Sequence, residues 1–469
     1  MNRREFIGGA FALAGAAVLA KSTRGPSALK VGVLSDVHVS PPDMYGSREA
    51  VDMFKKTLGF FKKEGVDAVV IAGDLTNDGM MREMRAFVDV WTDVFGGIDK
   101  GPARIFTTGN HEKVIFTSTK RKGDLSNPRY TDGLYKDVKK NWKALFGEEW
   151  SPFFIKTVKG YSFVGAHWAE WEDEKALRKF LQDNRASLVG RKPFFYVQHA
   201  HPQNSCYGTW TWHQKDGGPT HKVLAEYPNA VAFSGHTHYT ITDERSVWQG
   251  AFTSLGTGAL RWVSMPSGRE NGPLKNRDGR RMGNIGWGSQ GMVMSVWNDC
   301  MVFERYDFVN MEKLGDDWVV PVLTDRSGPR EFSFESRRRR MKAPEFSAGA
   351  KIAVSTRTGK GPGKKDERQV VVSFPAANGD RSPSRPFDYG VCVERTECDV
   401  VRTMCSKRVY QPGVQFAPSR DAKTVTCVFG VCELPQGKFR FAVTPMNSLG
   451  QKGRTLYHER SEGQSLLIQ

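Results

Sequence analysis

Several kinds of site are missing from this sequence of 469 residues. Its seven cysteines show no spacing typical of zinc ligands, which argues against a structural thiolate site. The glycine-rich stretch 359–365 lacks the strand, the spacing and the Ser or Thr of a P-loop, so it does not predict a phosphate cradle. The apolar stretch near the N-terminus is too short to span a membrane, and no membrane span is expected in the mature chain.

Acidic residues are also fewer than basic residues in this chain. The chain has 68 Lys and Arg against 51 Asp and Glu, a formal net charge of +17. Such a field would attract anionic partners, including phosphorylated glycans, lipids and nucleotides, although solvated surface lysines and arginines explain it equally well. The tetrabasic run 337–340 has no interleaved aromatic residues, so nucleic acid is permitted but not indicated as a partner.

Histidine is scarce, and its distribution is informative. Six of the ten histidines lie in or beside five short polar strings. In chain order these strings are Asp36-Val37-His38, Gly73-Asp74, Gly109-Asn110-His111-Glu112, His199 and Gly235-His236-Thr237-His238.

Each string comes directly after a short apolar run that predicts a buried strand. These runs are residues 30–34, 68–72, 103–108, 193–198 and 230–234. Helical spacing in 51–61 and 81–95 separates the first three runs, which predicts strands and helices in alternation and therefore a parallel sheet. Open α/β sheets bind ligands at the carboxyl ends of their strands, so we expect the five strings to meet there.

Aspartate, asparagine and histidine are oxygen and nitrogen ligands suited to a pair of divalent or trivalent metals. Two such ions about 3.5–4 Å apart can share one hydroxide and lower the pKa of its parent water from about 15.7 towards 7. The bridging hydroxide would attack phosphorus in line while the metals neutralise the phosphoryl oxygens. The strings therefore predict a two-metal hydrolase.

The order D-x-H, GD, GNH with an acidic residue, H and GHxH resembles the calcineurin-like metallophosphoesterase family over about residues 30–310. This resemblance implies a four-layer αββα sandwich with two facing sheets. It also implies that Asp74 bridges two metals, with Fe, Mn or Zn admitted by the absence of thiolates. The first metal would be held by Asp36, His38 and His238, and the second by Asn110, His199 and His236.

Other polar residues near the strings are candidates for further roles. His111 follows Asn110 and is the candidate for protonating the leaving alkoxide or stabilising phosphoryl charge. Glu112 or Asp78 could orient ring nitrogens. Either His199 or His201 could be the ligand in the fourth block. We favour His199 because it follows the strand directly, which leaves His201 free to meet substrate.

The loop 204–218 is rich in aromatic residues. Tyr207, Trp210 and Trp212 could stack on a base or sugar of the substrate, or could cap the core of the domain itself.

The N-terminal segment 1–20 resembles a twin-arginine export signal, since Arg3-Arg4 precedes a weakly apolar stretch that ends at Ala20. We therefore expect a periplasmic or extracellular protein, with an uncleaved anchor as the alternative. Five cysteines lie near the C-terminus, where oxidised pairs would agree with export.

The expected domains are a metallophosphoesterase domain at 28–310, a linker at 311–350 and a small β-sandwich at 351–469. Short β segments separated by turn residues predict the sandwich. The stretch 439–450 resembles the late strands of a fibronectin type III domain.

The favoured function is an exported phosphoric-ester hydrolase, either a phosphodiesterase or a phosphomonoesterase. A nuclease with the same ligands is one alternative. The other is a surface adhesion or glycan-binding protein, in which the metals are structural and the C-terminal domain binds the partner.

Overall fold

The computed structural model describes residues 25–41, 48–113, 128–208, 216–265, 288–361, 365–379 and 384–458. The expected export signal lies outside these residues. The described chain divides into two compact units. The first contains the residues up to Ile241, Arg245–Met265 and the residues from 288 to Ser333, and the second contains Thr242–Glu244 and the residues from Phe334 onward.

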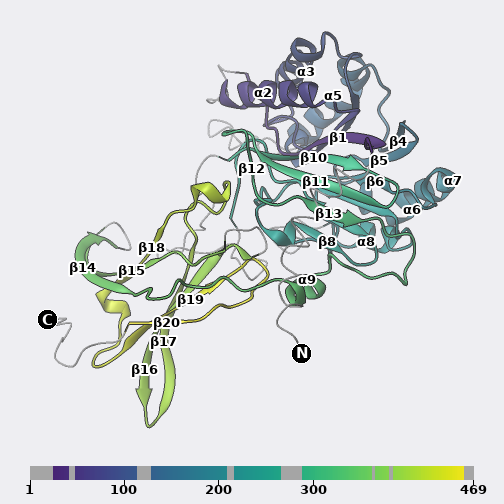
Figure 1. Cartoon of the computed structure of the whole chain (residues 1–469). Helices are drawn as coiled ribbons and strands as arrows, with labels where there is room; N and C mark the ends of the chain where they lie inside the picture. The colour runs from purple at the N-terminus through teal and green to yellow at the C-terminus, as the bar shows by residue number, and fades with distance from the viewer. Residues whose placement is uncertain are drawn as a thin grey trace. The chain divides into compact units, whose positions relative to one another are not determined.

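The first sheet of the first unit has the order β12-β11-β10-β1-β2-β3, with β13 also paired to β11. Its strands β1, β10 and β11 follow one another in Figure 1. Strands β1, β2 and β3 are parallel, as the alternating pattern predicted, and β10 runs antiparallel to β1. The strands span Leu29–Leu34 (β1), Ala68–Ala72 (β2), Ala103–Thr107 (β3), Gln290–Val296 (β10), Cys300–Asp307 (β11), Glu312–Lys313 (β12) and Trp318–Pro321 (β13).

The second sheet has the order β4-β5-β6-β7-β9-β8, and its four central strands are parallel. The predicted strands that precede His199 and His236 are β6 and β7 of this sheet. The strands span Phe153–Val158 (β4), Tyr161–Ala166 (β5), Phe194–Val197 (β6), Ala230–Ser234 (β7), Val247–Gln249 (β8) and Thr253–Gly256 (β9).

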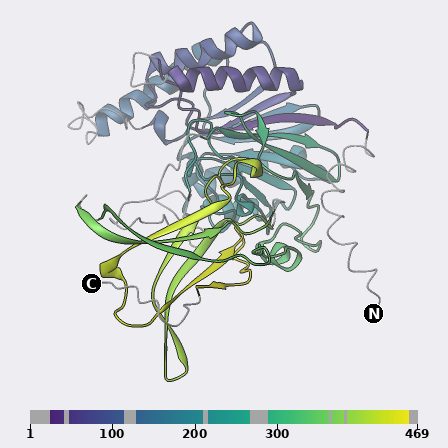
Figure 2. The same ribbon diagram turned by 60° about the vertical axis from the view of Figure 1, so that its left-hand side comes forward.

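Helices cover the outer face of each sheet, and a second direction of view shows the same layers (Figure 2). The helices span Arg48–Glu64 (α2), Met81–Phe95 (α3), Pro128–Phe146 (α5), Glu174–Asp183 (α6), Arg185–Leu188 (α7) and Pro219–Leu224 (α8). Phe54 and Phe61 of α2 pack with Trp91 of α3 against the first sheet, while Leu177 of α6 and Val223 of α8 pack against the second. Within the described residues, no helix is both long and apolar enough to cross a membrane.

A third core lies between the two sheets. Val31 and Val70 of the first sheet are buried there with Phe195 and Phe233 of the second. Sheets that bury side chains on both faces read as continuous apolar runs, which is why these strands were visible in the sequence. The predicted αββα sandwich is confirmed.

Glu83 closes the first turn of α3. Its Oε2 accepts hydrogen bonds from the backbone N–H groups of Asp78 (2.9 Å) and Met80 (3.2 Å). Burial, followed by the nearby charge of Asp78, raises the pKa of the Glu83 carboxyl from 4.5 to about 7. The helix ends at Gly96, whose φ of 89° is left-handed.

We predict that Glu83→Gln changes the pH dependence of stability. Because the folded-state pKa is raised, the folded chain holds this proton between about pH 4.5 and 7 while the unfolded chain releases it. The wild type therefore loses stability as pH rises through that window. Glutamine cannot ionise, so the variant escapes this loss. Its unfolding free energy relative to that of the wild type should rise by roughly 2 kcal/mol from pH 5 to pH 8.

Urea unfolding of both proteins, with metal chelated, measures this relative rise. Asp89→Asn, an exposed carboxyl on the same helix, should show none. A pH-independent difference for Glu83→Gln would contradict the assignment.

The second unit contains two antiparallel sheets, β14-β15-β18 and β17-β16-β19-β20, and one helix, α9. Their bounds are Phe334–Arg340 (α9), Ala353–Lys360 (β14), Asp366–Pro375 (β15), Asp388–Glu397 (β16), Val400–Tyr410 (β17), Thr424–Gly430 (β18), Arg440–Met446 (β19) and Leu456–Tyr457 (β20). Val372 of β15 and Phe429 of β18 share a core with Val391 of β16 and Val443 of β19. This confirms an all-β region after the sandwich, while its likeness to fibronectin type III stays a prediction.

Two features of this unit differ from the expectations. The five cysteines of this unit (Cys392, Cys398, Cys405, Cys427 and Cys432) are free thiols rather than members of oxidised pairs, as are Cys206 and Cys300 of the first unit. Strands β14 and β17 showed no clear pattern in the sequence. Most of their residues are exposed, and β17 forms a long hairpin with β16 that extends beyond the part of β16 paired with β19 (Figure 1).

The region 311–350, expected to be a linker, contains β12, β13 and α9 in the structure. The two strands are only two and four residues long, so they leave little periodic signal. The tetrabasic run is partly structural. Arg337 is buried and pairs with Glu244, and Nε of Arg338 donates to the carbonyl of Leu449 at 2.7 Å.

Candidate metal centre

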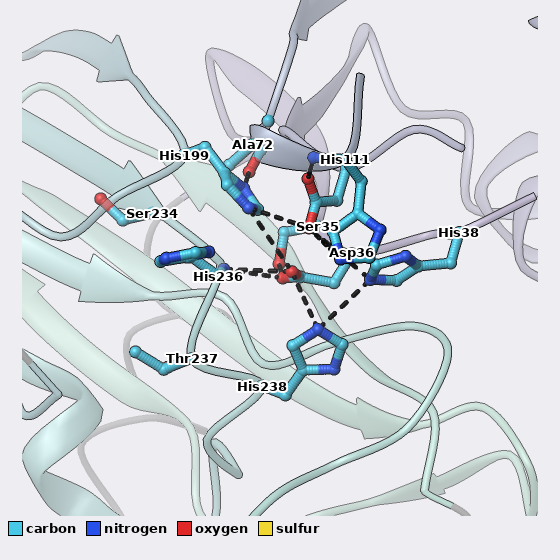
Figure 3. Close-up of polar contacts among 12 residues, drawn as sticks. Ser35, Asp36, His38, Ala72, His111, His199, Ser234, His236, Thr237 and His238 are labelled. Carbon is cyan, nitrogen blue, oxygen red and sulfur yellow. Dashed lines mark hydrogen bonds and ion pairs between the residues drawn. The ribbon is translucent and has the colours of Figure 1, made fainter. Parts of the chain in front are cut away.

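The five strings meet at one place in the first unit, as predicted from the strand ends. Figure 3 shows Asp36, His38, His111, His199, His236 and His238 gathered there. Their side chains form two groups of potential ligands, and within each group the ligand atoms lie within 4.8 Å of one another. The first group contains Asp36, His38, Asp74 and His238, and the second contains Asp74, His199 and His236. Asp74 belongs to both groups, the position expected of a bridging carboxylate.

The first group has the spacing of ligands around one cation. Nε2 of His38 lies 3.3 Å from Nε2 of His238, which in turn lies 3.2 Å from Oδ1 of Asp36. Oδ2 of Asp74 lies 3.7 Å from Nε2 of His38. Ligands held about 2.0–2.2 Å from a metal in octahedral or tetrahedral geometry stand roughly 3.0–3.4 Å apart. These residues therefore fit a metal ion.

The second group also fits a metal. Nε2 of His199 lies 3.0 Å from Oδ2 of Asp74, and the rings of His199 and His236 have centroids 4.8 Å apart. Oδ1 of Asn110 is buried and has no hydrogen-bond partner within the described residues. A buried acceptor left unpaired costs about 1–3 kcal/mol, and coordination of a cation would remove that cost.

Backbone carbonyls set the orientation of two ligand rings. Nδ1 of His199 bonds to the carbonyl oxygen of Ala72 at 2.7 Å, and Nδ1 of His238 bonds to that of Trp262 at 2.8 Å. A carbonyl can only accept, so each Nδ1 carries the proton. The Nε2 lone pair of each ring is then directed at the centre, as metal coordination requires.

The backbone at the ligands is strained. Five predicted ligands have left-handed φ angles although none is glycine: Asp36 (51°), His38 (49°), Asp74 (52°), His236 (70°) and His238 (56°). Each such residue costs on the order of 1–3 kcal/mol, which is tolerated where surrounding contacts enforce it. Glycine is required nearby, because a Cβ on Gly109 would lie 2.1 Å from Oδ1 of Asp74.

Burial and mutual charge decide the protonation of the ligands. Burial, then the adjacent His111, holds the pKa of His38 well below its ordinary value. Burial opposes charge on Asp74 and His199, but their attraction for each other outweighs it. The pKa of Asp74 is lowered and that of His199 is raised to about 9. A cation that binds His199 must therefore displace a proton.

His111 lies at the edge of the centre and is partly exposed. Its Nδ1 is 2.5 Å from the carbonyl oxygen of Asn77, so Nδ1 carries a proton there. Its Nε2 lies 3.9 Å from Oδ2 of Asp74, and its ring meets that of His38 edge-on at 4.4 Å. Nε2 of His111 thus faces the ligands without being one of them, which is the position expected of a proton donor.

Glu112 holds two ligand loops together. Its Oε2 accepts from the N–H of Gly109 at 2.6 Å, and its Oε1 accepts from the N–H and hydroxyl of Thr76 at 2.9 and 3.0 Å. Burial, with the neighbouring Asp74, raises its pKa to about 8. We expected Glu112 to orient ring nitrogens. In the structure its two oxygens instead bind Gly109 and Thr76.

The structure corrects two of the expected substrate contacts. His201 is buried, with Nε2 3.2 Å from the Thr237 hydroxyl and Nδ1 3.2 Å from the Cys206 sulfur, so it is neither a ligand nor open to substrate. Tyr207 is 8% exposed, stacked on Tyr239 and covered by the Arg245 guanidinium at 3.6 Å. It therefore caps the core. Trp210 and Trp212 lie outside the described residues.

The structure also reveals neighbours of the ligands that no strand-end pattern indicated. Trp262 stacks on the rings of His38 (4.7 Å) and His238 (4.4 Å). On the other side, Trp168 lies 5.6 Å from the ring of His199 and 5.3 Å from that of His236. The sequence could place Trp168 only after a strand, and it carried no signal for Trp262.

A family model for calcineurin-like phosphoesterases matches residues 29–240. No curated protein matches the chain. Among solved structures, a dimetal phosphatase from Danio rerio is 11% identical with a TM-score of 0.37, over 63% of this chain and 99% of that chain. A purple acid phosphatase from yellow lupin is 15% identical with a TM-score of 0.43, over 65% of this chain and 56% of that chain.

The match and the geometry agree. The matched residues hold every predicted ligand in the family's order, and in the structure these ligands converge on a shared aspartate. Residues 29–240 are therefore a calcineurin-like phosphoesterase domain, and the chain is a metal-dependent phosphoesterase.

Proposed function

We propose that this protein is an exported phosphoric-ester hydrolase with two metal ions, Fe, Mn or Zn, held by the two ligand groups. The observation that carries the proposal is the position of Asp74 in both groups, because a carboxylate has two oxygens and can serve two cations at once. When bound, such a pair supplies an acidified water and neutralises charge on the phosphoryl oxygens.

The protein's own residues contribute position and protons. Asp36, His38 and His238 would hold the first metal, and Asn110, His199 and His236 the second, with Asp74 between them. His111 would donate a proton to the leaving oxygen, a role supported by Nε2 facing the centre while Nδ1 is bound to a carbonyl. The carbonyls behind His199 and His238 keep those rings aligned through the reaction.

The net charge of +17 favours an anionic substrate such as a phosphorylated glycan, lipid or nucleotide. We would load the full chain with Mn, Fe or Zn and measure hydrolysis of an aryl phosphomonoester, an aryl phosphodiester and plasmid DNA. Metal-dependent turnover of an aryl ester is expected. Its monoester-to-diester ratio defines the substrate class, and cleavage of DNA alone would identify a nuclease instead. Absence of turnover with all three metals would refute the proposal.

Export rests on the sequence of residues 1–20. If Arg3 and Arg4 direct translocation of the folded protein, then replacing both by lysine should retain it inside the cell, because the paired arginines are the recognised feature. Fractionation of cells that express the wild type and the double variant would test this. Equal amounts of both proteins outside the cytoplasm would contradict the proposal.

A further inference from the structure

Arg261 lies beside the first ligand group and has no role so far. It comes shortly after β9, and its backbone N–H donates to the carbonyl of Asp36 at 3.1 Å. Its side chain returns to the same loop, where Nη1 donates to the carbonyl of His38 at 3.1 Å. Both contacts attach Arg261 to the segment that carries two ligands of the first metal.

The Arg261 guanidinium has no anionic partner among the residues that the structure describes. Within the described part of the chain, Arg261 forms no ion pair, and its Nε and Nη2 make no hydrogen bond. Arg261 is half-buried. Glu49 and Glu83 act on it only through longer-range attraction, and burial outweighs them in lowering its pKa. An arginine side chain that is removed from water usually pairs with a carboxylate or a phosphate, which accepts hydrogen bonds from two of its coplanar N–H groups.

Trp262, next to Arg261, packs against two rings of the first ligand group. Its indole stacks on His38 and His238 and is half-exposed, and the guanidinium of Arg261 lies 5.7 Å from its ring centre. The packed rings restrict where this segment can move. Residues 261–262 thus present, beside the rings of the first ligand group, a guanidinium whose Nε and Nη2 make no hydrogen bond within the described residues.

We propose that Arg261 binds a terminal phosphoryl oxygen of the substrate through Nε and Nη2, and that it favours phosphomonoesters. This inference rests on the proposed phosphoesterase function. A monoester dianion has three terminal oxygens, of which two metals can neutralise two, which leaves one for the guanidinium. In a diester that third position is an ester oxygen, which carries less charge and accepts a weaker hydrogen bond.

The test is Arg261→Gln in the full chain loaded with Mn, with inorganic phosphate as the probe. Calorimetric binding of phosphate should weaken about 10- to 100-fold, as expected for the loss of charge-assisted hydrogen bonds. The kcat/KM for an aryl monoester should fall by a similar factor, and that for the diester should fall by less than about 3-fold. Arg85→Gln, which removes an exposed arginine of α3, matches the change in net charge and should alter neither quantity.

Arg261→Lys separates recognition from a structural effect. Lysine keeps the charge and the stem but not the fork, so it should recover part of the phosphate affinity, while metal content and unfolding midpoint stay as in the wild type. Unchanged phosphate affinity in Arg261→Gln, or equal losses with monoester and diester, would overturn the inference. Phosphate binding reports on Arg261 even if no ester is hydrolysed, so failure of the proposed function is a distinct result.

Discussion

Asp74→Asn should reduce metal-dependent hydrolysis by about 10³-fold or more, because the proposed pair of metals would contribute several kcal/mol to stabilising the transition state. Asparagine offers one neutral oxygen in place of two charged ones. Asp74 is the residue shared by both ligand groups, at 3.0 Å from His199 and 3.7 Å from His38. We therefore expect the bound metal to fall from about two ions per chain to one or fewer.

Elemental analysis of the purified protein and turnover of an aryl phosphate measure both effects. Asp93→Asn is a suitable control, since this aspartate is exposed on α3 and its ion pair is with the exposed Lys55. Its variant should retain full activity and metal content. A variant of Asp74 that keeps two metals per chain and near-normal turnover would show that the carboxylate does not bridge the centre.

His111→Gln should lower kcat by about 10²- to 10⁴-fold on alkyl phosphate esters, the range that general acid catalysis supplies. The effect should be far smaller on a nitrophenyl ester, whose leaving oxygen needs little protonation. The structural basis is the position of His111 Nε2, which faces the ligands at 3.9 Å from Asp74 while Nδ1 is held by Asn77. Comparison of kcat across leaving groups of different pKa measures the change.

His221→Gln provides the matched control, because Nδ1 of His221 on α8 also bonds a backbone carbonyl, that of Gln203 at 2.6 Å. It should leave activity on both classes of ester unchanged. Equal losses for alkyl and aryl esters in His111→Gln would instead assign His111 to phosphoryl charge stabilisation, the other role that its place in the chain allows.

The sandwich and the converging ligands were predictable because two independent signals coincide. The strands that precede Asp36 and Asp74 are buried on both faces, and the strand that precedes Asn110 is buried over its last three residues, so they appear as apolar runs. Parallel strands bring their carboxyl ends to one edge, so residues next to those ends must be close. Strands without such a pattern, β14 and β17, were missed because exposed strands need no apolar alternation.

Roles that depend on side-chain direction were less accessible. His199 and His201 are two residues apart, and sequence favoured the first only because it follows β6 directly. The structure shows why the second could not serve, since its two nitrogens contact Thr237 and Cys206. The sequence allowed Tyr207 either to stack on the substrate or to cap the core. Its packing between Tyr239 and Arg245 shows that it caps the core.

The sequence by itself indicated the calcineurin-like phosphoesterase domain, the layered fold and the order of the ligands, because strand periodicity and residue chemistry are local properties. The family resemblance also implied that Asp74 is shared. Only the tertiary structure decided that Nε2 of His111 faces the centre and that Arg261 and Trp262 flank the first ligand group. Those facts depend on contacts between segments up to about two hundred residues apart, such as His38 with His238 at 3.3 Å. No local pattern encodes such distances, because they arise from how the two sheets pack against each other.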